Sequence, residues 1–141
     1  MIERDYIMRI LQEFFSMLSK LLRYKIEEPD WTLVQERFNE MYRQFFRHPP
    51  DYFYEMDNEE ILNELSRDEL SESEQQAMIQ MLSELLYQDG LIKKDIAEKL
   101  LLLDKALFLM KYLEQNSRTF SWDREQKMAD ISKILAEYNI Y

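Results

Sequence analysis

The sequence contains no cysteine and only one glycine, one histidine and three prolines among its 141 residues. Without cysteine the chain cannot form disulfides, thiolate metal sites or iron–sulfur clusters. One glycine cannot supply a glycine-rich phosphate loop, a dinucleotide-binding fingerprint or a nucleophile elbow. One histidine excludes a multi-histidine zinc site and the paired Glu-x-x-His motifs of di-iron bundles. We therefore expect no enzyme activity, no cofactor and no bound metal.

Long uncharged apolar runs are also missing, since no stretch approaches the roughly 18 residues of a membrane-spanning helix. The first residues, MIERDY, carry acidic charge and do not have the basic-then-apolar layout of a signal peptide. These two observations predict a cytoplasmic protein.

Basic residues are scarce in the middle of the chain. The formal net charge is −10, and residues 57–90 hold ten acidic residues against one basic residue. Nucleic-acid backbones and anionic membranes bind basic surfaces, so this balance opposes both. A partner of the middle segment is expected to be basic.

The residues that are abundant, above all Leu, Glu, Gln, Met and Lys, favour helices. Apolar residues recur at helical spacing, and we predict an all-α fold in one domain over residues 1–141. Five long helices are expected over residues 2–25, 31–47, 74–88, 92–115 and 122–138, with a short one over residues 57–66. Short links between long helices favour antiparallel neighbours.

Helix ends are marked by capping residues and breakers. Pro29 should break the chain after the first helix, because it lacks a backbone donor. The predicted N-caps are Asp30, Asp57 in a capping box with Glu60, Ser71 or Ser73, and Ser121. Gly90 is expected in a left-handed turn before the helix over residues 92–115. Residues 51–56, DYFYEM, are predicted to be irregular.

The helix over residues 92–115 is apolar on nearly all sides, which is typical of a helix with neighbours on several sides. We expect it at the centre of the fold, with Leu103 and Leu107 fully buried. Ile96 belongs to its broad apolar face and Leu101 to a second apolar stripe. Lys105 is placed on a narrow polar strip.

Two stretches suggest a relationship to known proteins. The opening MIERDYIMRI resembles a family of small uncharacterised bacterial proteins, a domain of unknown function. The stretch AEKLLLLDKALFLMKYLEQ, followed by a last amphipathic helix, is similar to the C-terminal part of that family and to a tetratricopeptide-like helix pair. The resemblance implies a bacterial, cytoplasmic, all-helical protein built as a tetratricopeptide-like stack of antiparallel helices. It carries over no site residues, and the tetratricopeptide pattern W-x-x-L-G-x-x-Y is absent.

Seven aromatic residues lie within residues 38–54. Aromatic residues at helical spacing usually belong to a core, but they are also enriched in protein interfaces. Candidate protein-contact residues in this cluster are Phe45, Phe46, Tyr52 and Tyr54. His48 is expected to end its helix and to interact with the last carbonyl groups.

The acidic residues of the middle segment could in principle bind a hard metal ion. Two sets of carboxylates are close in sequence: Asp57, Glu59, Glu60 and Glu64, and Asp68, Glu69, Glu72 and Glu74. Neither has the loop spacing of a calcium-binding EF-hand, so a solvated helix face is the preferred interpretation.

The leading functional prediction is a non-catalytic protein–protein interaction or scaffold module. It includes a homodimer formed through the aromatic cluster or the first helix. The alternative is an acidic mimic that binds a basic partner through residues 57–90. An enzyme without a recognisable motif ranks last. Function that is inferred from fold class alone is only an analogy.

Overall fold

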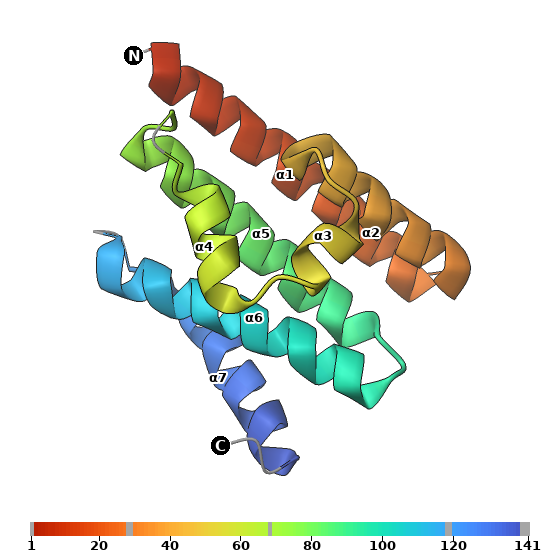
Figure 1. The fold of residues 1–141 in the computed structure, drawn as a ribbon. Helices are drawn as coiled ribbons and strands as arrows, with labels where there is room; N and C mark the ends of the chain where they lie inside the picture. The colour runs from red at the N-terminus through yellow and green to blue at the C-terminus, as the bar shows by residue number, and fades with distance from the viewer. Residues whose placement is uncertain (1, 28–29, 68, 118–119, 139–141) are drawn as a thin grey trace. The chain divides into compact units, whose positions relative to one another are not determined.

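A computed structural model describes residues 2–27, 30–67, 69–117 and 120–138 (Figure 1). Every regular element in these ranges is a helix, which confirms the all-α prediction. The contacts divide the chain into two units, residues 1–56 and residues 57–141. The prediction of one domain over the whole chain stays a prediction.

The first unit contains α1 (Ile2–Glu27), α2 (Trp31–Phe46) and α3 (Pro50–Tyr54). Helix α2 packs against α1, and α3 packs against α2. Asp30 is the N-cap of α2, because its carboxylate accepts a hydrogen bond from the backbone N–H of Leu33 at 3.2 Å. The predicted break at Pro29 lies outside the described residues.

The end of α2 differs from the prediction. Arg47 adopts a left-handed conformation with φ of 62°, and its N–H donates to the carbonyl oxygen of Arg43 at 3.0 Å. His48 does not cap the helix; its ring stacks on Tyr52, with 3.6 Å between the ring centroids. Arg47 therefore carries out the capping that was assigned to His48.

Residues 50–54 form the short helix α3, so the prediction of an irregular segment over residues 51–56 was wrong for most of its length. Pro50 occupies the first turn of α3. Its missing N–H and fixed φ suit that position, so the double proline both ends one helix and begins the next.

The second unit contains α4 (Asn58–Leu65), α5 (Glu72–Ile92), α6 (Ile96–Asn116) and α7 (Trp122–Glu137). Helices α5 and α6 form its main pair, α7 packs on α6, and α4 contacts both α5 and α6 (Figure 1). The N-caps Asp57, Ser71 and Ser121 are confirmed by hydrogen bonds from the backbone. Asp57 also forms the predicted capping box with Glu60.

Gly90 does not form a turn, so that prediction was wrong. It lies inside α5 and has no positive φ. A Cβ at this position would lie 3.2 Å from the Cβ of Leu102 and 3.2 Å from the Cδ2 of Leu103. The glycine therefore lets α5 and α6 approach closely. The turn comes later, and Asp95 begins α6 by accepting a hydrogen bond from the N–H of Glu98 at 3.0 Å.

Helix α6 confirms the predicted burial of Leu103 and Leu107. Ile96 and Leu101, which were assigned to apolar stripes, are exposed, whereas Lys105 from the predicted polar strip is buried. Burial lowers the pKa of Lys105, although nearby carboxylates, including Asp104 on α6, oppose this effect.

Candidate interaction surface at the start of α7

The first turn of α7 is fixed by polar contacts. Ser121 accepts a hydrogen bond at its Oγ from the backbone N–H of Arg124 at 3.1 Å. The guanidinium of Arg124 then donates through Nε to a carboxylate oxygen of Glu114 on α6 at 2.6 Å. The start of the helix is thus capped by its own serine and joined to α6 by an ion pair.

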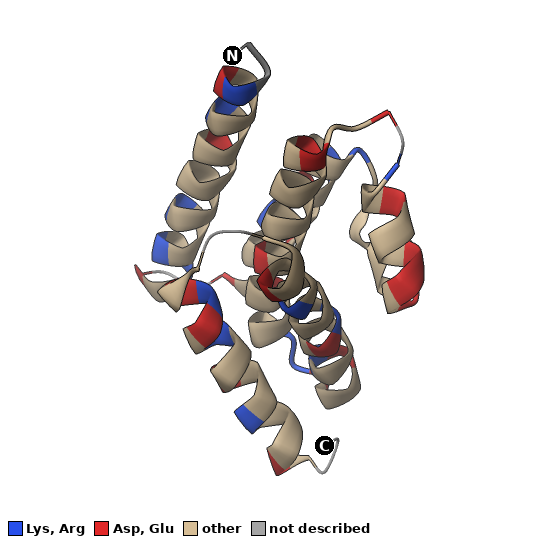
Figure 2. Cartoon of the chain, turned by 90° about the vertical axis from the view of Figure 1, so that its left-hand side faces the viewer, with Lys and Arg blue, Asp and Glu red and all other residues tan. Residues whose placement is uncertain are grey.

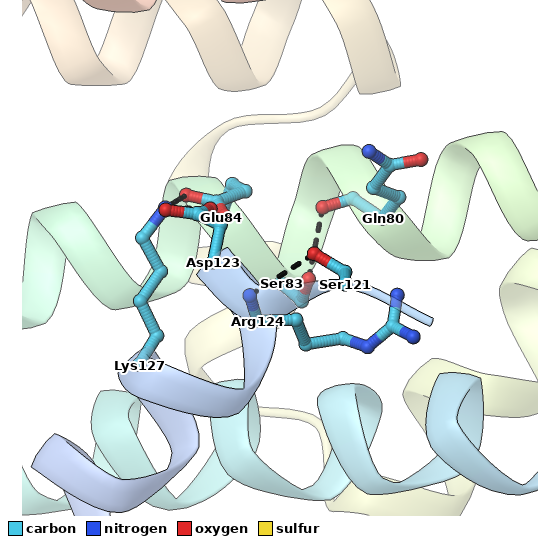
Figure 3. A network of polar contacts seen from close by, with 7 residues as sticks. All are labelled: Gln80, Ser83, Glu84, Ser121, Asp123, Arg124 and Lys127. Atoms are coloured by element: carbon cyan, nitrogen blue, oxygen red, sulfur yellow. Dashed lines mark hydrogen bonds and ion pairs between the residues drawn. The ribbon is translucent and has the colours of Figure 1, made fainter. Parts of the chain in front are cut away.

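One turn further along, Lys127 joins α7 to α5 (Figure 3). Its Nζ donates to both carboxylate oxygens of Glu84 on α5, at 2.6 Å and 2.7 Å, and to Asp123 at 2.8 Å. The side chains of Lys127 and Glu84 are only 18% and 10% exposed to solvent, whereas the side chain of Asp123 is 73% exposed. One ammonium group therefore bridges a buried and an exposed carboxylate.

Burial and charge act in opposite directions on this pair. Burial raises the pKa of Glu84 because the carboxylate loses water, and the hydrogen bonds from Lys127 only partly oppose this. Burial would lower the pKa of Lys127, but its contacts with Asp123 and Glu84 outweigh that effect and raise its pKa. The ring of Tyr87 lies 5.7 Å from the same ammonium group. Each of these contacts favours the charged lysine.

The fully buried residues of α7 lie in its second half. Its buried residues are Ile131 and Leu135. The start of the helix is held by the ion pairs instead, and this leaves two large rings uncovered. Phe120 is 62% exposed and Trp122 is 79% exposed. The two rings contact each other edge to face, with 5.1 Å between their centroids and an angle of 89° between their planes.

We call Phe120 and Trp122 the aromatic pair. The sequence interpretation missed it, because the predicted contact regions are the aromatic residues within 38–54, the first helix and the acidic segment over residues 57–90. A signal was present in the spacing. At 3.6 residues per turn, the nine positions between Trp122 and Ile131 place them roughly 180° apart around the helix. If Ile131 faces the core, Trp122 faces away from it.

The predicted contact residues in the first unit lie among other rings. Phe46 is buried, with its ring 5.7 Å from Phe53 in an edge-to-face contact. Phe45 packs in the same way on Phe14 at 5.2 Å, and Tyr54 on Tyr42 at 5.9 Å. The remaining candidate, Tyr52, is the residue that stacks on His48. Phe45, Tyr52 and Tyr54 are half-buried, and a contact role for them stays a prediction.

A groove of about 300 Å³ lies between α1 and α2. Apolar side chains and the ring of Tyr24 form much of its lining, together with three charged residues, Lys20, Arg37 and Glu40. Arg37 and Glu40 lie 3.7 Å apart as an exposed ion pair. The groove is at the lower end of the size range of small-molecule sites.

The acidic residues of the middle segment do not all face solvent. Asp89 is buried and pairs with Lys93 at 3.5 Å, and Glu84 is buried against Lys127. The exposed acidic residues concentrate on α4 and around the start of α5 (Figure 2). Within the described ranges, no group of three or more His, Asp or Glu side chains is arranged to hold a metal ion.

Comparison of the sequence with models of known protein families finds no match. Comparisons with curated proteins and with solved structures also find none. No helix in the described part of the chain is both long enough and apolar enough to span a membrane.

Proposed function

We propose that the chain is a non-catalytic protein-interaction module whose contact site is the aromatic pair. The carrying observation is that Phe120 and Trp122 touch each other while both stay largely exposed. Aromatic side chains, Trp above all, are enriched among the residues that contribute most to protein–protein binding. A partner surface that covers both rings removes their apolar area from water, and this favours binding.

The geometry of the start of α7 supports this proposal. The Ser121 cap and the ion pairs of Arg124 and Lys127 hold the helix start in one position. A contact group that is already held in place loses less conformational freedom when it binds, so more of the contact energy appears as affinity.

Further parts of the proposal concern the architecture and the setting. The helix pairs α1–α2 and α5–α6 would belong to a tetratricopeptide-like stack in a bacterial cytoplasmic protein. The partner is another protein, and a second copy of the chain is one version of it. Helical repeat folds use extended helix surfaces for such contacts, and this argument is an analogy of fold.

The acidic mimic stays as a second candidate. The exposed acidic residues on α4 favour it, because Glu59 and Glu60 lie on the surface there (Figure 2). Glu84 and Asp89 weaken it, because both are buried in ion pairs and present no charge to a partner. The mimic would therefore rely on fewer charges than the sequence of residues 57–90 contains.

Affinity capture with the purified chain tests the leading proposal. Wild type, the Phe120→Ala/Trp122→Ala double variant and Leu101→Ala are compared, since Leu101 is an exposed apolar residue in the first half of α6, 13 positions before Glu114. A captured protein is then purified and its binding measured directly. We expect the double variant to bind at least about thirtyfold more weakly, as for a binding hot spot of 2 kcal/mol or more.

Two controls complete the experiment. Circular dichroism and thermal unfolding check that the double variant keeps its fold, and sedimentation velocity checks whether wild type self-associates through the same residues. Binding that is lost equally with Leu101→Ala, or that survives in the double variant, contradicts the proposal. Loss of binding with Phe45→Ala or Tyr54→Ala alone would move the site to the aromatic cluster of the first unit.

A further inference from the structure

We infer that the aromatic pair binds a cationic segment of the partner, with an arginine side chain stacked on Trp122. This inference rests on the proposed function and adds the chemistry of the partner. It follows from the charge of the second unit, from the ion pairs that Arg124 and Lys127 already form on α7, and from the chemistry of the exposed rings.

The charge of the second unit is strongly negative. Residues 57–141 hold 18 acidic and 10 basic residues, which gives a formal net charge of −8. A surface of one sign attracts partners of the opposite sign and raises their association rate. A basic segment would thus be drawn toward the unit that carries the aromatic pair, and an acidic one would be repelled.

Two basic residues lie in the first turns of α7, and both are already occupied. Arg124 is paired with Glu114 at 2.6 Å and its side chain is 13% exposed. Lys127 is held between Glu84 and Asp123 and is 18% exposed. Neither presents its charge freely to a partner.

Among the described residues of α7, the exposed charge next to Trp122 is negative. Asp123 follows Trp122 directly and is 73% exposed, so its carboxylate keeps acceptor sites beyond its bond to Lys127. Glu125 is three positions after Trp122 on the same helix face, but it is half-buried and its carboxyl group is hydrogen-bonded with Glu114 on α6. A guanidinium group that contacts Trp122 would therefore find the exposed carboxylate of Asp123 within the same turn.

The exposed rings have the chemistry that cations require. The face of an aromatic ring carries negative charge density, and Trp attracts cations more strongly than Phe or Tyr. A guanidinium group is planar and weakly hydrated, so it can lie flat on the indole while donating to a carboxylate at its edge. The edge-to-face contact with Phe120 leaves Trp122 79% exposed for such stacking.

The test uses the intrinsic fluorescence of Trp122. The chain has two tryptophans, so a Trp31→Phe background leaves Trp122 as the reporter. Three capped peptides serve as probes: alternating Arg and Gly, the same peptide with uncharged citrulline for Arg, and the same peptide with Glu for Arg. We expect the Arg peptide alone to change the emission of Trp122, with weaker binding at higher salt because the charges are screened.

Variants then separate the ring from the charge. With a fluorescently labelled Arg peptide, Trp122→Ala should reduce the affinity at least about fivefold, the equivalent of a cation–π contact of about 1 kcal/mol. Asp123→Asn should weaken binding more than Asp130→Asn, which removes the same charge two turns further along α7. Equal effects of these two substitutions would mean that binding depends only on net charge. This result would contradict the proposal that an arginine stacks on Trp122.

The outcomes distinguish this inference from the proposed function. Equal binding of the Arg and citrulline peptides, or no binding of the Arg peptide up to about 1 mM, overturns the cationic partner. If partner capture still depends on the aromatic pair in that case, the interaction module stands with an uncharged contact. If capture does not depend on the pair, the proposed function fails as well.

Discussion

The ammonium group of Lys127 on α7 lies 2.6 Å and 2.7 Å from the two carboxylate oxygens of Glu84 on α5. Both side chains are largely buried, so each charge depends on the other for the hydrogen bonds that water would otherwise provide. The pair holds the start of α7 next to α5, where the helix buries little apolar surface of its own. Removing this ion pair should therefore lower the stability of the protein and change the surroundings of Phe120 and Trp122.

Replacing Lys127 should lower the free energy of unfolding more than replacing Glu84. Lys127→Met leaves Glu84 charged and buried without a cation, and we expect a loss of about 2–3 kcal/mol, slightly below the range for fully buried pairs. Glu84→Gln leaves Lys127 its second partner, Asp123, and should cost about 1 kcal/mol. Urea unfolding of both variants and of the double variant forms a mutant cycle. A double variant that loses the full sum would show that the two side chains do not interact.

The stability contribution of Glu84 should depend on pH. Its pKa is raised in the folded protein above the ordinary value of 4.5, so the folded state holds the proton more tightly than the unfolded state. Stability from this group is complete below pH 4.5 and falls as the pH rises through the folded pKa. The difference in unfolding free energy, wild type minus Glu84→Gln, should therefore decrease as the pH is raised from 4 toward neutral. An increase over that range would contradict the raised pKa.

The central position of α6 predicts a large cost for truncating its core. Leu103→Ala should destabilise the protein by about 2–5 kcal/mol, because the residue is fully buried and leaves a cavity. Leu101→Ala, two positions earlier on the exposed side, should cost less than about 1 kcal/mol. Chemical denaturation of the two variants gives a matched comparison. Similar losses would show that α6 is not organised around the buried face.

Gly90→Ala tests the close approach of α5 and α6. Alanine favours a helix over glycine by about 1 kcal/mol, and an exposed site would gain that amount. Here the new Cβ would lie 3.2 Å from the Cβ of Leu102, an atom that moves only with its backbone. We expect crowding to exceed the helix gain, with a net loss of about 1 kcal/mol. A more stable variant would mean that the two helices separate easily.

Local sequence patterns predicted the all-helical class and several of the helix beginnings. Asp30, Asp57, Ser71 and Ser121 cap as expected, because an N-cap needs only its own side chain and the next three residues. The wrong predictions concern the double proline and Gly90, because each of these sequence features is compatible with two local structures. A double proline can end a helix or begin one, and a glycine can bend a chain or admit a neighbour. Sequence alone does not choose between these structures.

The sequence by itself determined the all-helical class, the capped helix starts and the burial of Leu103 and Leu107, since these follow from residue type and spacing. The tertiary structure decided which side chains of α7 stay in water. Two ion pairs hold its start, one between Lys127 and Glu84, 43 positions apart, and one between Arg124 and Glu114, 10 positions apart, and Trp122 stays exposed. Such contacts join elements that are distant in sequence, and a helical spacing cannot reveal a partner on another helix.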